Sequence, residues 1–420
     1  MKIGFLTLGC KVNQYEADSL AQTLSGMGHE ICEELQSDLD MVFLSTCAVT
    51  NEAERKSRQM ISKINKICPK AKIFVCGCAS QNDSKHFEDK KNVCVIVGTS
   101  GKEWLTKMLD ESGCYVVDAP YDYEEMSAPK KHRTRSYLKI QDGCNNFCTY
   151  CLIPYIRGRS RSRKLESIVV EAFNMAKQSK EIVLTGIDLS SWGEDLNCDI
   201  ISLIDSLKTI NARIRFSSME AKIINNNFLK ALKEMPNFCP HFHLSMQSGA
   251  NKTLKDMNRK YTKEEYLKKV EMIHDAFPEG AVTTDLIVGF PTETEEDFLE
   301  TLNTIKKAKF ADIHIFPYSK RNKTVAARYK QIDGEVMQNR VERATKLKDE
   351  LHQEFLLSQI GTNQEVLLEQ DVVGGYMVGH SRNFSKIYVE KQKLKSGDLV
   401  VAKVLRLFKD GLLAEVVQKI

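Results

Sequence analysis

Three closely spaced cysteines are the strongest chemical signal in the sequence. Cys144, Cys148 and Cys151 lie in the segment QDGCNNFCTYCLIP with the spacing C-x3-C-x2-C. Three thiolates on one loop can bind one metal centre and leave a coordination position open, as a catalytic metal needs. A zinc knuckle would use a fourth Cys or His at short spacing, and neither residue follows before Cys198. Iron–sulfur ligation, with one iron open to a small molecule, is therefore the better interpretation.

A second set of cysteines is dispersed over the first 80 residues. Cys10, Cys47 and Cys78 each lie at or just past the end of an apolar run, in KIGFLTLGC, MVFLSTC and KIFVCGC. If these runs are parallel strands, their carboxyl ends meet at one edge of the sheet, where such sheets bind ligands. Three converging thiolates would form a second metal centre. Cys76 lies inside its run and is better explained as a buried core residue.

The elements that position the dispersed cysteines alternate between strands and helices. We expect helices at 14–27 and 52–67, and buried parallel strands at 2–8, 41–44, 73–76 and 93–97. This alternation predicts a doubly wound α/β domain over residues 1–125, and a polar stretch at 118–130 predicts a linker.

The same alternation resumes around the C-x3-C-x2-C segment. We expect helices such as 164–179, 262–277 and 295–307 between strands at 137–140, 181–185, 213–217, 241–246, 282–288 and 313–317. These units predict a partial (βα)6 barrel over residues 130–357, with the cysteine loop at the carboxyl end of its first strand, where barrels hold their chemistry.

The pattern changes after a long helix expected at 334–357. Short strands without intervening helices are expected at 366–370, 375–379, 385–389, 399–407 and 412–417. They predict a small antiparallel β-barrel over residues 358–420, so that the whole chain is an α/β protein with a C-terminal β-barrel.

The segments around both sets of cysteines resemble a known enzyme family. C-x3-C-x2-C with Tyr150 before the last cysteine resembles the radical S-adenosylmethionine (SAM) enzymes, in which a [4Fe-4S] cluster leaves one iron for SAM. LGCKVNQYEAD, STCAVTNEAERKSRQ and GCASQ resemble the signatures of the methylthiotransferases, and the resemblance extends through LTGIDLSSWG, LSMQSG and DLIVGFPTETEEDF into a TRAM-like RNA-binding C-terminal barrel. It implies SAM and two [4Fe-4S] clusters, one held by Cys10, Cys47 and Cys78 and the other by Cys144, Cys148 and Cys151.

The resemblance also implies a reaction and partners. GCKVNQYE and TCAVTNEA are most similar to the enzymes that methylthiolate C2 of N6-threonylcarbamoyladenosine at position 37 of tRNA. This C–H bond is unactivated, so a SAM-derived 5'-deoxyadenosyl radical is needed where side-chain acids and bases would fail. The implied partners are the tRNA anticodon stem-loop and an electron donor such as flavodoxin or ferredoxin.

Two alternatives stay open at this stage. A sister methylthiotransferase acting on N6-isopentenyladenosine in tRNA, or on a ribosomal protein, would share the cysteines and differ in substrate. A non-enzymatic iron–sulfur protein that binds RNA or senses redox state would also explain cysteines and basic patches. That protein would not need groups for holding SAM.

Residues at the expected strand ends are candidates for holding SAM, because a barrel supplies polar groups from several strands. Those implied by the resemblance are Thr185, Gly186, Glu220, Ser245, Gln247, Asp285 and Gly289. Glu220 is the candidate for the SAM ammonium, and Ser245 and Gln247 are candidates for the ribose hydroxyls. His241 and His243 begin a strand, opposite the catalytic end, so we expect hydrogen-bonded or exposed histidines there.

Charge bears on the contact with RNA. The formal net charge is only +4, so RNA would have to be bound by local patches. We expect phosphate contacts from four basic clusters, which are Lys130, Lys131, Arg133 and Arg135; Arg157, Arg159, Arg161 and Arg163; Lys320, Arg321, Lys323 and Arg328; and Arg382, Lys386, Lys391, Lys393 and Lys395.

Composition also bears on the compartment. No apolar run approaches the roughly 18 residues that span a bilayer. The count of thirteen cysteines is odd and their spacing is irregular, which favours metal chemistry over a disulfide framework. We therefore expect a cytoplasmic protein without a membrane segment.

Overall fold

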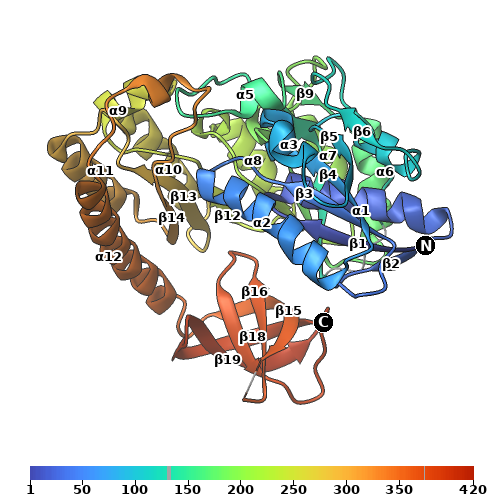
Figure 1. Ribbon diagram of the computed structural model, residues 1–420. Helices are drawn as coiled ribbons and strands as arrows, with labels where there is room; N and C mark the ends of the chain where they lie inside the picture. The colour runs from blue at the N-terminus through green and yellow to red at the C-terminus, as the bar shows by residue number, and fades with distance from the viewer. Residues whose placement is uncertain (130–133, 373) are drawn as a thin grey trace.

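The computed structural model describes residues 1–129, 134–372 and 374–420 (Figure 1). Lys130, Lys131 and Arg133 of the first basic cluster lie outside the described residues. Along the chain, an N-terminal sheet is followed by a central half-open barrel and a C-terminal closed barrel.

The N-terminal region is a parallel sheet with the strand order β2-β1-β3-β4-β5-β6. Its strands are β1 (Lys2–Thr7), β2 (Glu30–Cys32), β3 (Met41–Thr46), β4 (Lys72–Gly77), β5 (Val93–Val97) and β6 (Gly113–Tyr115). Its helices are α1 (Lys11–Gly26), α2 (Asn51–Ile67), α3 (Cys78–Asn82) and α4 (Lys85–Glu88). Helices α1 and α2 contribute to different apolar clusters, through Leu20 and Leu24 and through Ile61 and Ile64, so the expected doubly wound fold is confirmed.

The central region has six parallel strands in two three-stranded sheets. They are β7 (Arg135–Lys139), β10 (Glu181–Thr185), β11 (Arg213–Phe216), β12 (His241–His243), β13 (Ala281–Val288) and β14 (Asp312–Pro317). Isolated bridges between Ile214 and Phe238 and between Met219 and Leu244 join the two sheets. The six strands therefore form one continuous row, which is the expected partial barrel.

Helices alternate with these strands, as the sequence predicts. They are α5 (Ile153–Ile156), α6 (Leu165–Ala176), α7 (Ile200–Leu207), α8 (Asn226–Lys233), α9 (Asn251–Asp256), α10 (Lys263–Ala276) and α11 (Glu295–Ala308). A short hairpin of β8 (Gln141–Asp142) and β9 (Arg161–Ser162) brackets the cysteine loop.

The C-terminal region is a closed barrel with the order β15-β16-β17-β19-β18, as expected for the TRAM-like module, although β17 and β19 pair in parallel and not antiparallel as the other neighbours do. Its strands are β15 (Asn363–Val372), β16 (Tyr376–Ser381), β17 (Lys386–Glu390), β18 (Leu399–Phe408) and β19 (Gly411–Lys419). Figure 1 shows it at one end of the molecule, connected by the long helix α12 (Gly334–Ser358).

The closed barrel contacts the amino-terminal end of the central strands. Arg213 donates to the carbonyl of Glu365 at 3.3 Å, and Arg215 donates to the carbonyl of Ser381 at 3.1 Å. Both arginines also pair with the fully buried carboxylate of Glu181 on β10. The C-terminal barrel therefore covers the end of the central barrel opposite the cysteine loop.

None of the helices among the described residues combines the length and the apolar character needed to cross a membrane.

Candidate functional site

The C-x3-C-x2-C loop follows β8 and brings its three sulfur atoms together. Burial raises the pKa of the Cys144 and Cys151 thiols to about 12, and each is raised further by the charge of Cys148. Each sulfur accepts one N–H group at 3.4 Å, and the donors are the amides of Asn146 and Ile153 and the guanidinium of Arg259. N–H donors aimed at three neighbouring sulfurs suit thiolates that hold an iron–sulfur cluster.

A buried glutamine holds this loop in place. Gln141 Oε1 accepts from the amides of Ile187 and Asp188 at 2.9 and 2.8 Å, while its Nε2 donates to the carbonyl of Gly143 at 2.8 Å. Gly143 has φ +71°, and a Cβ there would lie 1.9 Å from the carbonyl oxygen of Arg159. Only glycine fits before the first cysteine of the loop.

The dispersed cysteines also meet, at the carboxyl ends of β1, β3 and β4. Burial raises the pKa of Cys47 to about 11, and the nearby Cys78 and Cys10 raise it further. Gly9 has φ +107°, and a Cβ added to it would lie 3.3 Å from the sulfur of Cys47. The glycine therefore allows the Cys10 loop to approach Cys47, and the sheet edge gathers three thiols as the sequence predicts.

A fully buried arginine joins this triplet to the central barrel. Arg157 donates from Nη1 to both carboxylate oxygens of Asp142 at 3.1 Å and to Glu16 at 3.2 Å. Its Nε has no hydrogen-bond partner among the described residues. Burial raises the pKa of the Cys78 thiol, and the Arg157 charge opposes that rise. Arg157 is therefore placed to stabilise a thiolate at Cys78.

Arg157 belongs to a buried charge network that spans the two domains. The network contains the carboxylates of Glu16 and Asp142 and the cationic side chains of Lys102, Lys139, Arg157 and Arg161. The excess positive charge beside the Cys10, Cys47 and Cys78 triplet suits a thiolate-bound cluster, which carries negative charge. The donor sets of both triplets therefore fit iron–sulfur clusters.

Cys151 of the barrel triplet and the segment directly after Cys47 line a cavity of about 240 Å³. Ala48, Val49 and Thr50, directly after Cys47, line one side of it. The residues on the opposite side, from the central barrel, are Tyr150, Cys151, Leu152, Ile153, Ile156, Gln247, Asp285, Ile287, Phe316, Pro317, Tyr318 and Ser319. The cavity therefore lies between the N-terminal domain and the cysteine loop of the barrel.

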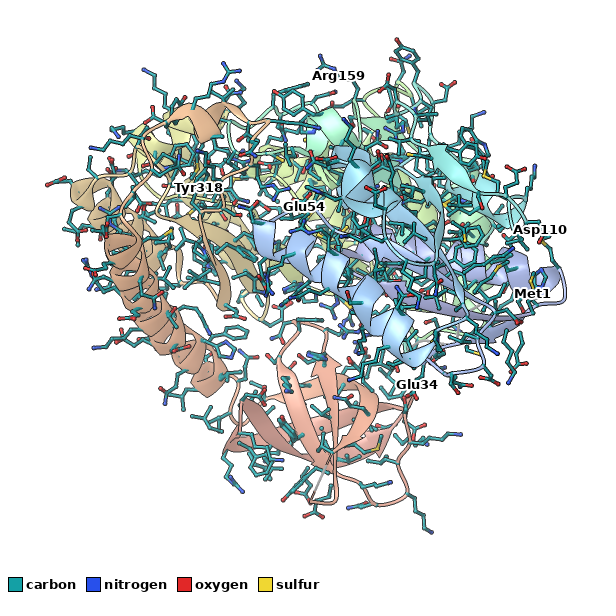
Figure 2. All side chains as sticks on the ribbon, viewed as in Figure 1. Met1, Glu34, Glu54, Asp110, Arg159 and Tyr318 are labelled. Carbon is teal, nitrogen blue, oxygen red and sulfur yellow. The ribbon has the colours of Figure 1, made fainter. Side chains whose placement is uncertain are left out.

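The loop after β14 fixes the walls of this cavity. The Asn51 amide donates to Ser319 Oγ at 3.0 Å, and Asn51 Nδ2 donates to the carbonyl of Lys320 at 3.0 Å. Arg321 pairs with Glu54 at 2.7 Å. Figure 2 labels Glu54 and Tyr318 at this junction of the N-terminal domain and the barrel.

The structure separates the residues that the sequence suggested for SAM. Gln247 and Asp285 line the 240 Å³ cavity, and Gln247 has φ +67°, a strained backbone of the kind found at functional sites. Glu220 instead lines a second cavity of about 550 Å³ beside Cys148, and its carboxylate is paired with Arg259.

The other four candidates have structural partners. Thr185 is buried, and the carbonyl of Ser245 accepts hydrogen bonds from Arg259 and Tyr261. Gly186 lies against Gln141, and Gly289 lies against Met337. A role in binding SAM stays a prediction for all seven residues.

Three supporting residues were missed by sequence reasoning. Gln141, Arg157 and Arg259 touch or position the cysteine loops through partners that lie far away in the sequence. Gln141 directly precedes the DGC segment, which was the one available signal. Arg259 lies outside every recognised segment.

The expectation that the basic cluster after the cysteine loop contacts phosphate is wrong for three of its members. Arg157, Arg161 and Arg163 are buried, because each pairs with a buried carboxylate, and Arg163 pairs with Glu171 at 2.6 Å. Arg159 is exposed, and Figure 2 shows it at the edge of the molecule.

Other basic residues are also occupied within the protein. Arg135 pairs with Glu369, Arg321 with Glu54 and Lys386 with Asp410. Lys323 donates to the carbonyl of Asn82, and Arg382 donates to the carbonyls of Pro236 and Phe238. Lys320, Arg328, Lys391, Lys393 and Lys395 are exposed, so RNA contact stays a prediction for them.

Comparisons with known proteins agree with these features. Residues 138–305 match the Radical SAM superfamily, and residues 2–98 match the Uncharacterized protein family UPF0004. The chain is 37% identical to a threonylcarbamoyladenosine tRNA methylthiotransferase of Bacillus subtilis, over 96% of this chain and 94% of the relative. It is also 37% identical to a tRNA-2-methylthio-N(6)-dimethylallyladenosine synthase of Thermoanaerobacter sp., over 86% of this chain and 81% of that relative.

A solved structure supports the fold. The radical S-adenosylmethionine methyltransferase TsrM from Kitasatospora setae, with cobalamin and a [4Fe-4S] cluster bound, aligns with 90% of this chain and 77% of its own at a TM-score of 0.55 and 11% identity. Because two tRNA methylthiotransferases are 37% identical over 96% and 86% of this chain, and residues 138–305 match the Radical SAM superfamily, the chain belongs to the radical SAM methylthiotransferase family.

Proposed function

We propose that the protein transfers a methylthio group to C2 of N6-threonylcarbamoyladenosine at position 37 of tRNA. The observation that supports it best is the cavity between the segment after Cys47 and the barrel cysteine loop, bordered by Ala48 to Thr50 on one side and Tyr150 to Ile153 on the other. A base in this cavity would lie between the group that generates a radical and the group that carries sulfur.

The choice of base follows from relatives that align over nearly the whole chain. The Bacillus subtilis enzyme, which is named for threonylcarbamoyladenosine in tRNA, covers 96% of this chain. GCKVNQYE and TCAVTNEA around Cys10 and Cys47 support the same substrate.

Family membership brings SAM and two [4Fe-4S] clusters, and these groups supply the 5'-deoxyadenosyl radical and the transferred sulfur when they are bound. Cys144, Cys148 and Cys151 would hold one cluster, with N–H donors on each sulfur. Cys10, Cys47 and Cys78 would hold the other, with Arg157 balancing its negative charge. The cavity walls are mostly apolar, which would limit the access of water to a radical formed there.

Nucleoside mass spectrometry tests the substrate directly. The chain would be expressed in a host whose tRNA carries N6-threonylcarbamoyladenosine without the 2-methylthio group. We expect 2-methylthio-N6-threonylcarbamoyladenosine to appear in digested tRNA and to be absent with the Cys144→Ala variant. Unchanged N6-threonylcarbamoyladenosine in the presence of a fully loaded enzyme would refute this substrate.

A second candidate substrate comes from the synthase of Thermoanaerobacter, which is also 37% identical to this chain. This is N6-isopentenyladenosine, named in that relative as dimethylallyladenosine. The same digest separates the two, because 2-methylthio-N6-isopentenyladenosine differs in mass and retention time.

Further partners belong to the proposal. Cleavage of SAM consumes one electron, so we include a one-electron donor such as flavodoxin or ferredoxin. Because tRNA, SAM and such donors are present in the cytoplasm, a cytoplasmic location is also proposed.

The two cysteine triplets are predicted to have separable roles. Replacing Cys10, Cys47 and Cys78 with Ala should abolish methylthiolation, while dithionite-reduced enzyme still cleaves SAM, because the barrel loop is untouched. Formation of 5'-deoxyadenosine, measured by chromatography, and the modified nucleoside are followed in parallel. Cys76→Ala, a buried neighbour outside the triplet, is the matched control and should retain both activities. Loss of SAM cleavage while the barrel cluster is still visible by spectroscopy would contradict this division.

The C-terminal barrel is predicted to contribute phosphate contacts. Lys393 and Lys395 are exposed, so Lys393→Gln with Lys395→Gln should weaken tRNA binding and reduce the slope of log K against log salt by about 1 to 2. Filter binding at several salt concentrations measures the slope. The charge-matched control is Lys63→Gln with Lys66→Gln on the exposed face of α2. An unchanged slope in the barrel variant would exclude these two lysines as phosphate contacts.

A further inference from the structure

A third cavity, of about 460 Å³, lies at the amino-terminal end of the central barrel. Side chains from β11, β12, β13 and β14 line it, and His380, Phe384 and Asp410 of the C-terminal barrel close it. Asp285 borders both this space, which we call the lumen, and the 240 Å³ cavity at the cysteine loops.

Three possible metal ligands meet in the lumen. Asp285 lies between two histidines, with Oδ2 at 3.2 Å from Nε2 of His243 and Oδ1 at 3.2 Å from Nδ1 of His314. All three ligand atoms lie within 4.8 Å of one another. Neighbouring strands place them there, because the strand pairing sets Asp285 beside His314 and sets His243 beside Thr283, two residues before Asp285.

The surroundings match those of a metal-binding histidine. His243 Nδ1 lies 2.9 Å from Thr283 Oγ1, so an N–H donated there leaves the Nε2 lone pair facing the carboxylate. His243 is buried, while His314 is exposed to the lumen and leaves room for water at further coordination positions. The sequence could suggest only the H-x-H pair, and the structure shows His241 instead turned towards Thr283 and Phe384.

The charge of the lumen permits a cation at this point. Arg135 and Arg215 also line the space, but they are paired with Glu369 and Glu181. Lys386 is also on the wall and is paired with Asp410. Lys11 is the remaining Lys or Arg among the described residues that line the space, and desolvation lowers the pKa of its ammonium. Asp285 and Asp312 supply negative charge close to the two histidines.

We propose that His243, Asp285 and His314 bind one divalent transition-metal ion of the Zn²⁺ or Fe²⁺ type. Two imidazoles and one carboxylate with open positions are a ligand set that such ions prefer over Mg²⁺ or Ca²⁺, which favour oxygen ligands. The bound ion would connect β12, β13 and β14 and fix the Asp285 side chain beside the 240 Å³ cavity at the barrel cysteine loop.

The test uses the full chain with both iron–sulfur clusters reconstituted, so that the six cluster cysteines are occupied. Zn²⁺ is the probe, and binding is measured by anaerobic equilibrium dialysis with metal analysis. We expect about one Zn²⁺ per chain that excess Mg²⁺ does not displace. His314→Ala should weaken binding at least about 100-fold, since even residues that only support a metal ligand contribute 10- to 100-fold.

His352 supplies the matched control. It also lines the lumen, but its Nδ1 is bonded to the carbonyl of Ala311 at 2.8 Å, outside the ligand set. His352→Ala should therefore bind Zn²⁺ like the parent protein. Anomalous scattering at the zinc edge locates the ion, and the iron edge locates the clusters independently.

Three outcomes would overturn the proposal. These are no Zn²⁺ bound by the loaded protein, equal affinity in the parent and His314→Ala proteins, or a zinc peak away from Asp285. The first would leave direct contacts between Asp285 and the histidines without a metal, and the other two would place the ion elsewhere. None of these readouts depends on the substrate of the enzyme, so the metal site and the proposed function fail or succeed separately.

Discussion

Replacing Cys144, Cys148 and Cys151 with Ala should lower the iron content from about eight to about four per chain and abolish SAM cleavage. The number follows from two four-iron clusters, with one proposed at each triplet. The remaining iron is expected at Cys10, Cys47 and Cys78, because that triplet lies on a separate sheet edge. Iron is measured after anaerobic reconstitution, and SAM cleavage is measured as 5'-deoxyadenosine formed after reduction.

Cys239→Ala is the control for this experiment. Cys239 is fully buried in the same barrel but lies outside the loop, so its variant should retain all the iron. A full iron content in the triple variant would show that other residues hold the barrel cluster.

Arg157→Met should lower the free energy of unfolding by about 3 kcal/mol, since removing one member of a buried ionic network leaves its partners undercompensated. Asp142 and Glu16 lose a shared cation, and the Cys78 thiol loses the positive charge beside it. The variant should therefore also retain less iron at the N-terminal triplet than the parent protein. Denaturant titration measures the first effect and iron analysis the second.

Arg159→Met provides a matched comparison two residues along the chain. Arg159 is exposed, so its loss should change the free energy of unfolding by less than about 0.5 kcal/mol. If both variants unfold at the same denaturant concentration as the parent, the buried network does not stabilise the contact between the domains.

The architecture could be predicted from the sequence because local patterns encode it. The expected strand at 181–185 matches β10, and the expected helix at 52–67 begins one residue after α2 does. Strands β2 and β6 were missed, since three residues at a sheet edge carry too little periodicity to identify. The strand expected at 241–246 ends at His243 in the structure, and Gln247 follows in a left-handed conformation.

Both cysteine triplets could be predicted, the dispersed one because parallel strands end at one sheet edge and the other because a single segment contains all three cysteines. The C-x3-C-x2-C loop is such a segment, and its cysteines come together as expected. The prediction that Arg157, Arg161 and Arg163, which follow this loop, bind phosphate was wrong. Their partners Glu16 and Glu171 lie on other elements, so nothing near Arg157 or Arg163 in the sequence shows that these cations are neutralised inside the protein.

The contact between Arg213, Arg215 and the C-terminal barrel has a consequence for biosynthesis. The carbonyl groups that accept from these arginines belong to Glu365, His380, Ser381 and Arg382, which are translated after the whole central barrel. Until β15 and β16 have left the ribosome, the lower end of a nascent barrel has charged groups but not their final partners. The central barrel therefore gains these hydrogen-bond partners only after residues 365–382 have been synthesised, so a chain ending before residue 363 is expected to be less stable than the full chain.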